Sequence, residues 1–147
     1  MSYLVDTNVL GRIVQKAHPM HQDAVRAVRR LRRQAEELCI VPQNLIELWV
    51  VATRPLAGNG FGLTTDEAVI VMRRFKRLFR LRPDAPVIFS RWERLVKVHQ
   101  VSGKPAHDAR LVAAMQAHGI THILTFNTAD FKRYSDLITV SAPSEIA

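Results

Sequence analysis

Two periodicities of apolar residues alternate from one end of this chain to the other, and together they leave few folds open. Short runs rich in branched residues, each typical of a strand buried on both faces, occupy residues 3–5, 38–41, 86–89, 122–125 and 137–140. Apolar residues recur at helical spacing over residues 21–38, 44–53, 66–81, 90–101 and 107–118. Strands that alternate with helices predict a parallel sheet covered on both sides. We therefore expect a three-layer α/β fold with four or five parallel strands.

Length and composition fit one folded domain over residues 1–147. The chain has 147 residues, of which 48% are hydrophobic, and no repeat or long linker divides it. Its single cysteine, Cys39, lies in an apolar run and excludes an internal disulfide. No signal peptide and no apolar run of membrane-spanning length is visible, so we expect a cytoplasmic protein without a membrane partner.

The charge balance favours a polyanionic partner. Lys and Arg number 21 against 13 Asp and Glu, which gives a net charge of +8. A basic excess of this size is typical of nucleic-acid-binding proteins. Two helical stretches carry rows of basic side chains suited to phosphates or, equally, to solvation: Arg26, Arg29, Arg30 and Arg33 in the first, and Arg73, Arg74, Lys76, Arg77 and Arg80 in the second.

Four acids lie where predicted elements begin or end. Asp6 ends the first strand, Glu47 lies in the first turn of the helix after the second strand, Asp108 opens a helix, and Asp130 follows the fourth strand by five residues. Sites in open parallel sheets form at the carboxyl ends of the strands. We therefore expect these acids to gather at one edge of the sheet.

Gathered carboxylates repel one another and stay ionised only when a cation lies among them. Mg²⁺ and Mn²⁺ prefer such oxygen ligands and activate water for attack on a phosphodiester. Each acid also has a structural interpretation: Asn44 with Glu47, and Asn127 with Asp130, have the spacing of helix capping boxes, and Asp108 suits a helix N-terminus. Only the joint pattern favours a metal site.

Four segments resemble one known family in order and spacing. They are residues 4–10 (LVDTNVL), 43–55 with Gln43 to Trp49 and Thr53-Arg54-Pro55, 107–114 (HDARLVAA) and 123–131 (ILTFNTADF). The whole chain resembles PIN-domain ribonucleases, and among them the VapC-type toxins of bacterial toxin–antitoxin modules.

The resemblance implies a Mg²⁺- or Mn²⁺-dependent endoribonuclease that cuts single-stranded or loop RNA. It implies that Asp6, Glu47 and Asp108 bind metal, that Asp130 occupies the fourth acidic position, and that Thr7, Asn8 and Asn127 assist. It further implies a cognate antitoxin and a homodimer. Trp49 and the loop from Arg54 to Leu63 are our candidates for the dimer contact.

Two other functions remain open on the residues alone. A Mg²⁺-dependent phosphoacceptor signalling domain shares the fold class, but it requires adjacent acids after the first strand, where Thr7 follows Asp6. A nucleic-acid-binding module without catalysis explains the charge but not the four acids. Incubation with RNA, with and without Mg²⁺, separates the three functions.

Overall fold

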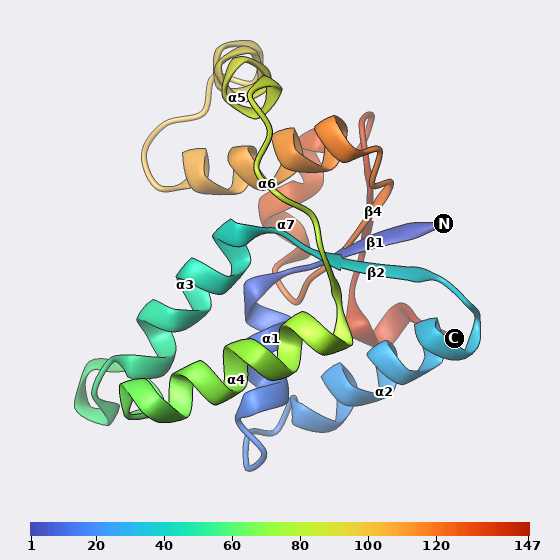
Figure 1. Cartoon of the computed structure of the whole chain (residues 1–147). Helices are drawn as coiled ribbons and strands as arrows, with labels where there is room; N and C mark the ends of the chain where they lie inside the picture. The colour runs from blue at the N-terminus through green and yellow to red at the C-terminus, as the bar shows by residue number, and fades with distance from the viewer.

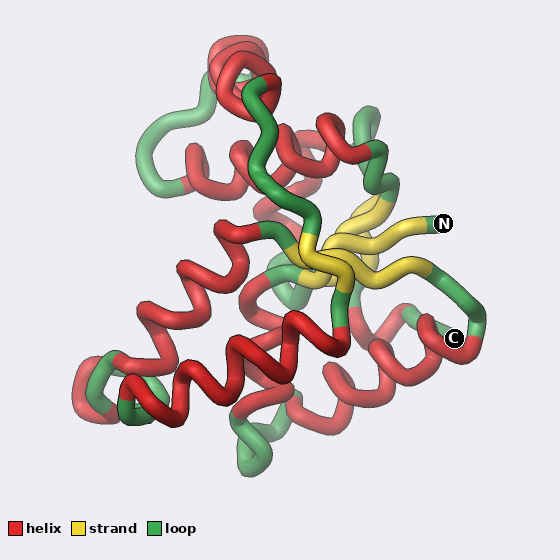
Figure 2. Tube along the Cα trace, in the orientation of Figure 1, coloured by secondary structure: helices red, strands yellow, loops and turns green.

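A five-stranded sheet, in which every pair of neighbouring strands is parallel, forms the centre of the molecule. The structure is a computed structural model that describes all 147 residues. Its strands are β1 (Ser2–Val5), β2 (Glu37–Ile40), β3 (Arg80–Leu81), β4 (His122–Leu124) and β5 (Thr139–Ser141), in the order β3-β2-β1-β4-β5. Figure 2 shows these strands enclosed by helices. The predicted parallel α/β sheet is confirmed.

Seven α-helices surround the sheet: α1 (Thr7–Val14), α2 (His21–Arg33), α3 (Pro42–Thr53), α4 (Thr65–Leu78), α5 (Val87–Val98), α6 (Pro105–His118) and α7 (Thr128–Phe131). Successive residues of β1 point to opposite faces. Leu4 packs with α5, α6 and α7 in one core, whereas Tyr3 and Val5 pack with α1, α2, α3 and α4 in another. Figure 1 shows α5 and α6 on one side and α1, α2 and α4 on the other.

The order of the strands reverses at β1. The chain adds β2 and β3 on one side of β1 and later adds β4 and β5 on the other. The carboxyl ends of β1 and β4 are therefore neighbours, and the Asp6 N–H after β1 donates to the Leu124 carbonyl at 3.0 Å. Figure 1 shows α1, α3 and α6 beginning at this edge, on the side of the molecule away from the two termini. Ligand sites form where strand order reverses in this way.

The prediction of a strand at residues 86–89 is wrong. These residues open α5, where Ile88 and Leu95 lie seven positions apart on the buried face that packs on α6. The third strand is instead β3, a two-residue edge strand inside the stretch 66–81 that was predicted as one helix. The apolar spacing continues through Phe79, but α4 ends at Leu78 and Phe79 is extended. The predicted helix over 21–38 likewise ends at Arg33, because β2 begins at Glu37.

None of the helices combines the length and the apolar character that crossing a membrane requires.

Candidate active site

Asp6 is a buried carboxylate at the junction of β1 and α1, where it is the N-cap of α1. Its Oδ1 accepts the Thr7 N–H at 2.7 Å, and its Oδ2 accepts the Thr125 hydroxyl at 2.8 Å and the Asn8 amide at 3.3 Å. The Asn8 amide also donates to Thr125 at 3.1 Å. Residues from the ends of two adjacent strands thus fix the orientation of this one carboxyl group.

Glu47 is joined to the same edge through Thr7. The Thr7 hydroxyl donates to Glu47 Oε1 at 3.0 Å and accepts the Asn44 amide at 3.3 Å. Asn44 is fully buried, and its Oδ1 accepts the Val41 N–H at 2.9 Å at the start of α3. Asn44 therefore caps α3 with its own side chain, and Glu47 is not its capping-box partner but faces Thr7.

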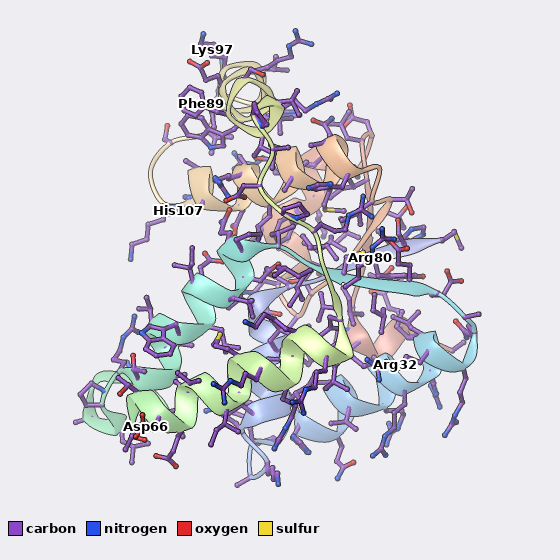
Figure 3. The ribbon with its side chains drawn as sticks, viewed as in Figure 1. Arg32, Asp66, Arg80, Phe89, Lys97 and His107 are labelled. Carbon is purple, nitrogen blue, oxygen red and sulfur yellow. The ribbon has the colours of Figure 1, made fainter.

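Asp108 lies half-buried in the first turn of α6, which begins at Pro105. The start of α6 is fastened to α3 by Gln43, whose amide donates to the His107 carbonyl at 2.8 Å and accepts from Arg110 at 3.2 Å. Figure 3 shows His107 at this end of α6, next to the beginning of α3. The connection brings Asp108 to the edge that carries Asp6 and Glu47.

The fourth acid lies differently from the other three. Asp130 is exposed on the short helix α7, and its side chain neither caps that helix nor lines the cavity described below. Asn127, at the start of α7, does line the cavity, and its N–H donates to Thr125 at 3.0 Å. The capping box proposed for Asn127 and Asp130 is absent, because no side-chain hydrogen bond caps α7.

An open, polar cavity of about 420 Å³ unites most of the predicted residues. Asp6, Thr7, Asn8, Glu47, Asp108 and Asn127 line its sheet end. Gly11, Arg12, Gln15, Val51, Asn59 and Phe61 line the part farther along α1 and α3. The structure thus brings together six of the seven predicted site residues and leaves Asp130 at the margin.

The acids perturb one another's ionisation. Burial raises the pKa of Asp6 to about 7, and the charges of Asp108 and Glu47 add to the rise against the lowering effect of its hydrogen bonds. Burial also raises the pKa of Asp108 to about 6, followed in size by the charges of Asp130 and Glu47. The charge of Asp130 therefore contributes to the raised pKa of Asp108, although Asp130 does not line the cavity.

The donor set fits a divalent ion of the Mg²⁺ or Mn²⁺ type. Carboxylate, hydroxyl and amide oxygens line the sheet end of the cavity, and these are the ligands that such ions take. No three acidic, histidine or cysteine side chains stand close enough to enclose one ion by themselves. Mg²⁺ usually retains several waters and one or two carboxylates, so the arrangement is compatible with it.

Four side chains of this region were not predicted as part of it. Thr125, Asn44 and Gln43 are buried polar residues that orient Asp6, Thr7 and the start of α6. Thr125 ends the predicted strand 122–125, and Gln43 and Asn44 lie where the predicted strand 38–41 gives way to the predicted helix 44–53. These positions were the available signal. The fourth is Arg12, which lines the cavity from the second turn of α1. Nothing in its local sequence distinguishes it from the other arginines.

Carboxylates lie at the carboxyl ends of the central strands of this parallel sheet. This is the edge at which α/β proteins bind their ligands. The PIN domain model matches residues 3–137. The chain therefore belongs to the PIN-domain family.

Solved structures similar to this chain include proteins of toxin–antitoxin systems. VapBC-1 from nontypeable Haemophilus influenzae gives a TM-score of 0.69 at 13% identity, over 98% of this chain and 99% of that chain. A toxin–antitoxin complex from Klebsiella pneumoniae gives 0.64 at 20% identity, over 99% and 100%. Mycobacterium tuberculosis VapC20, described as a sarcin-ricin loop cleaving toxin, gives 0.63 at 19% identity, over 93% and 96%. No curated protein matches the sequence.

Proposed function

We propose that this protein is a Mg²⁺- or Mn²⁺-dependent endoribonuclease that cuts single-stranded or loop RNA. The observation that carries the proposal is the meeting of Asp6, Glu47 and Asp108 at one cavity, with the pKa of two of them raised. Three carboxylates gathered at one cavity, two of them with raised pKa, are typical of a functional site. A bound divalent cation offsets their mutual repulsion.

Each side chain has a defined part in this proposal. Asp6, Glu47 and Asp108 would hold the ion, directly or through its waters, while Asp130 adds negative charge from outside the cavity. The ion supplies a bound water of lowered pKa and charge stabilisation at the phosphate. Thr125 and Asn8 hold the Asp6 carboxylate in position, and Thr7 does the same for Glu47. The openness of the cavity suits a flexible strand better than a buried small molecule.

RNA as the substrate rests on charge and on the family. The net charge of +8 suits a polyanion, and the structurally similar VapC20 is described as cleaving an RNA loop. A phosphoacceptor domain is less suited, because Thr7 stands where its second acid would be and is engaged with Glu47. A non-catalytic binding module leaves the perturbed carboxylates without a role.

We also propose that a cognate antitoxin restrains this enzyme, as its structural neighbours occur in such complexes. A second cavity, of about 380 Å³, lies between α1 and α4 and is mostly apolar. It is lined by Ile13, Val14, Leu63, Ile70, Val71 and Phe75, with Lys16, Glu67 and Arg74 also on its wall. An amphipathic helix of the partner suits this groove, and an arginine or lysine beyond it suits the acids.

The test is cleavage of a labelled single-stranded RNA by the wild type and by Asp6→Asn. Cleavage should require added Mg²⁺ or Mn²⁺, stop in excess chelator and be absent from Asp6→Asn. Equal cleavage by both proteins would identify a contaminating nuclease, and full activity in chelator would exclude the metal mechanism. Co-expression with the neighbouring gene tests the antitoxin: a partner that fails to co-purify, or that leaves cleavage unchanged, would refute that part alone.

A further inference from the structure

One cation lines the cavity of the three acids without an acidic partner. Arg12 donates from its guanidinium to Gln15 Oε1 at 2.7 Å, and its buried Nε has no hydrogen-bond partner. No carboxylate of the chain lies within salt-bridge distance of it, although Asp6, Glu47 and Asp108 line the same cavity. A guanidinium that lines a cavity without a carboxylate partner indicates an anionic ligand there.

Arg12 lies farther along α1 than the end of the helix that adjoins the acids. Asn8, which contacts Asp6, and Arg12 are four residues apart on this helix, which corresponds to a rise of about 6 Å. That rise is comparable to the spacing of successive phosphates in an extended strand. A strand whose scissile phosphate lies at the acids would therefore bring a neighbouring phosphate to Arg12.

An aromatic ring lines the same cavity as Arg12. Phe61 lines the cavity and lies against Gly11, where a Cβ would meet its ring at 3.2 Å. Its backbone is fixed, because the Phe61 N–H donates to Val51 at 3.0 Å and the Leu63 N–H donates to Ala52 at 2.9 Å. Figure 1 shows this segment where the chain turns from α3 into α4. The ring is thus held in place, and it is only partly buried.

This inference rests on the proposed RNA cleavage and adds a subsite to it. We infer that the part of the cavity farther from the sheet binds the nucleotide next to the scissile phosphate, with Arg12 paired to its phosphate and Phe61 stacked on its base. Arginine recognises phosphate through the N–H groups of its planar guanidinium, and Arg12 lines the cavity. Stacking on an aromatic ring accepts any base, so the subsite fixes the strand without dictating its sequence.

The phosphate contact is tested by the salt dependence of binding. A fluorescent single-stranded oligoribonucleotide is titrated with an Asp108→Asn parent, which prevents cleavage, in Mg²⁺ and increasing KCl. Adding Arg12→Met should weaken binding and reduce the slope of log Kd against log salt by about 0.7, the value for one phosphate of a single strand. Arg12→Lys should retain most of the slope. Arg91→Met, which removes an equal charge from an exposed position on α5, is the matched control.

The stacking contact is tested in the same assay with two replacements of Phe61. Phe61→Leu fills the space without an aromatic face and should weaken binding about tenfold, whereas Phe61→Tyr should bind like the parent. With an oligonucleotide that lacks bases, Phe61→Leu and Phe61→Tyr should bind with the same affinity. Thermal melts of all variants identify any loss of folding.

The outcomes separate this inference from the proposed function. If the wild type cuts RNA but Arg12→Met has the salt slope of Arg91→Met, the subsite is refuted and the nuclease stands. A change in Mn²⁺ affinity with no change in slope would make Arg12 a counter-charge for the acids, and would also refute it. If the wild type does not cut RNA, the nuclease assignment fails whatever the binding data show.

Discussion

Asp6 carries its carboxyl group in an environment that opposes the charge needed for metal binding. Burial and two neighbouring acids raise its pKa from 3.8 to about 7. The folded state therefore holds this proton more tightly than the unfolded chain does. Without metal, the free energy of unfolding must decrease as pH rises from about 4 to about 7, where the folded state alone keeps the proton. A bound cation reverses the preference.

We therefore expect Asp6→Asn to change the pH dependence of stability in a metal-free protein. The mutation removes the buried charge. The free energy of unfolding of Asp6→Asn, taken relative to that of the wild type, should therefore be larger at pH 8 than at pH 5 by roughly 2 kcal/mol. Urea unfolding in chelator at the two pH values measures this difference. A hydrogen bond that asparagine fails to make lowers stability equally at both pH values, so its contribution cancels in the comparison. If the two proteins differ in unfolding free energy by the same amount at both pH values, the raised pKa of Asp6 is contradicted.

Asp130 acts on the site from outside the cavity, through the pKa of Asp108. Its replacement by asparagine should lower that pKa, so the acidic limb of the activity profile should move to lower pH. The rate at neutral pH should fall by about tenfold, because the site loses a negative charge that favours the proposed cation. Rate profiles with Mn²⁺ measure both effects, and Asp136→Asn is the exposed control. If the acidic limb of Asp130→Asn stays at the same pH as in the wild type, Asp130 does not affect the pKa of Asp108.

Among the elements, α3 most directly joins fold and site. Its cap, Asn44, satisfies the Val41 N–H and also positions Thr7 against Glu47. Asn44→Ala should cost about 1–3 kcal/mol of stability and also reduce cleavage, because Thr7 loses its support. Thr64→Ala removes a comparable cap from α4, where Thr64 and Glu67 form a capping box. This control should cost about 1 kcal/mol and leave cleavage unchanged. Equal losses of activity would mean that stability alone explains the effect.

Elements with a strong local signal could be predicted, and weak ones could not. β1, β2 and β4 are buried runs flanked by helices, and they lie where the pattern indicated. A run of four apolar residues does not distinguish a strand from the first turn of a helix, and residues 86–89 open α5 because Ile88 packs in the core with α6. β3 has only two residues, both exposed, and tertiary pairing with β2 defines it.

The same distinction holds for the site at the scale of the whole molecule. Acids at the ends of predicted elements could be placed at one edge from connectivity alone. Thr125 and Arg12 could not be assigned, because their roles arise from contacts between segments far apart in the sequence, such as Thr125 with Asp6. Basic side chains also spread widely: Figure 3 shows Arg32 and Lys97 on opposite sides of the molecule. Overall charge therefore predicts a class of partner but does not locate a binding surface.

Exposed apolar side chains lead us to expect a homodimer, the commonest oligomer. On α3, Ile46 and Val50 lie four residues apart on one face, with exposed fractions of 64% and 49%, and Leu56 in the following loop reaches 76%. Trp49, our candidate from the sequence, is only partly exposed, so we place the contact on Ile46 and Val50. On α5, Phe89 is 64% exposed and its ring lies 5.6 Å from that of Trp92.

Light scattering during gel filtration at micromolar concentration should therefore give twice the mass of the chain. Ile46→Lys combined with Val50→Lys should give a monomer, because a two-fold contact places each introduced charge in an apolar interface twice. Ile70→Lys is the matched control, since Ile70 is 56% exposed on α4 and should leave the dimer intact. A monomeric wild type would refute the dimer. A double variant that remains dimeric, with unchanged melting, would exclude α3 as the interface.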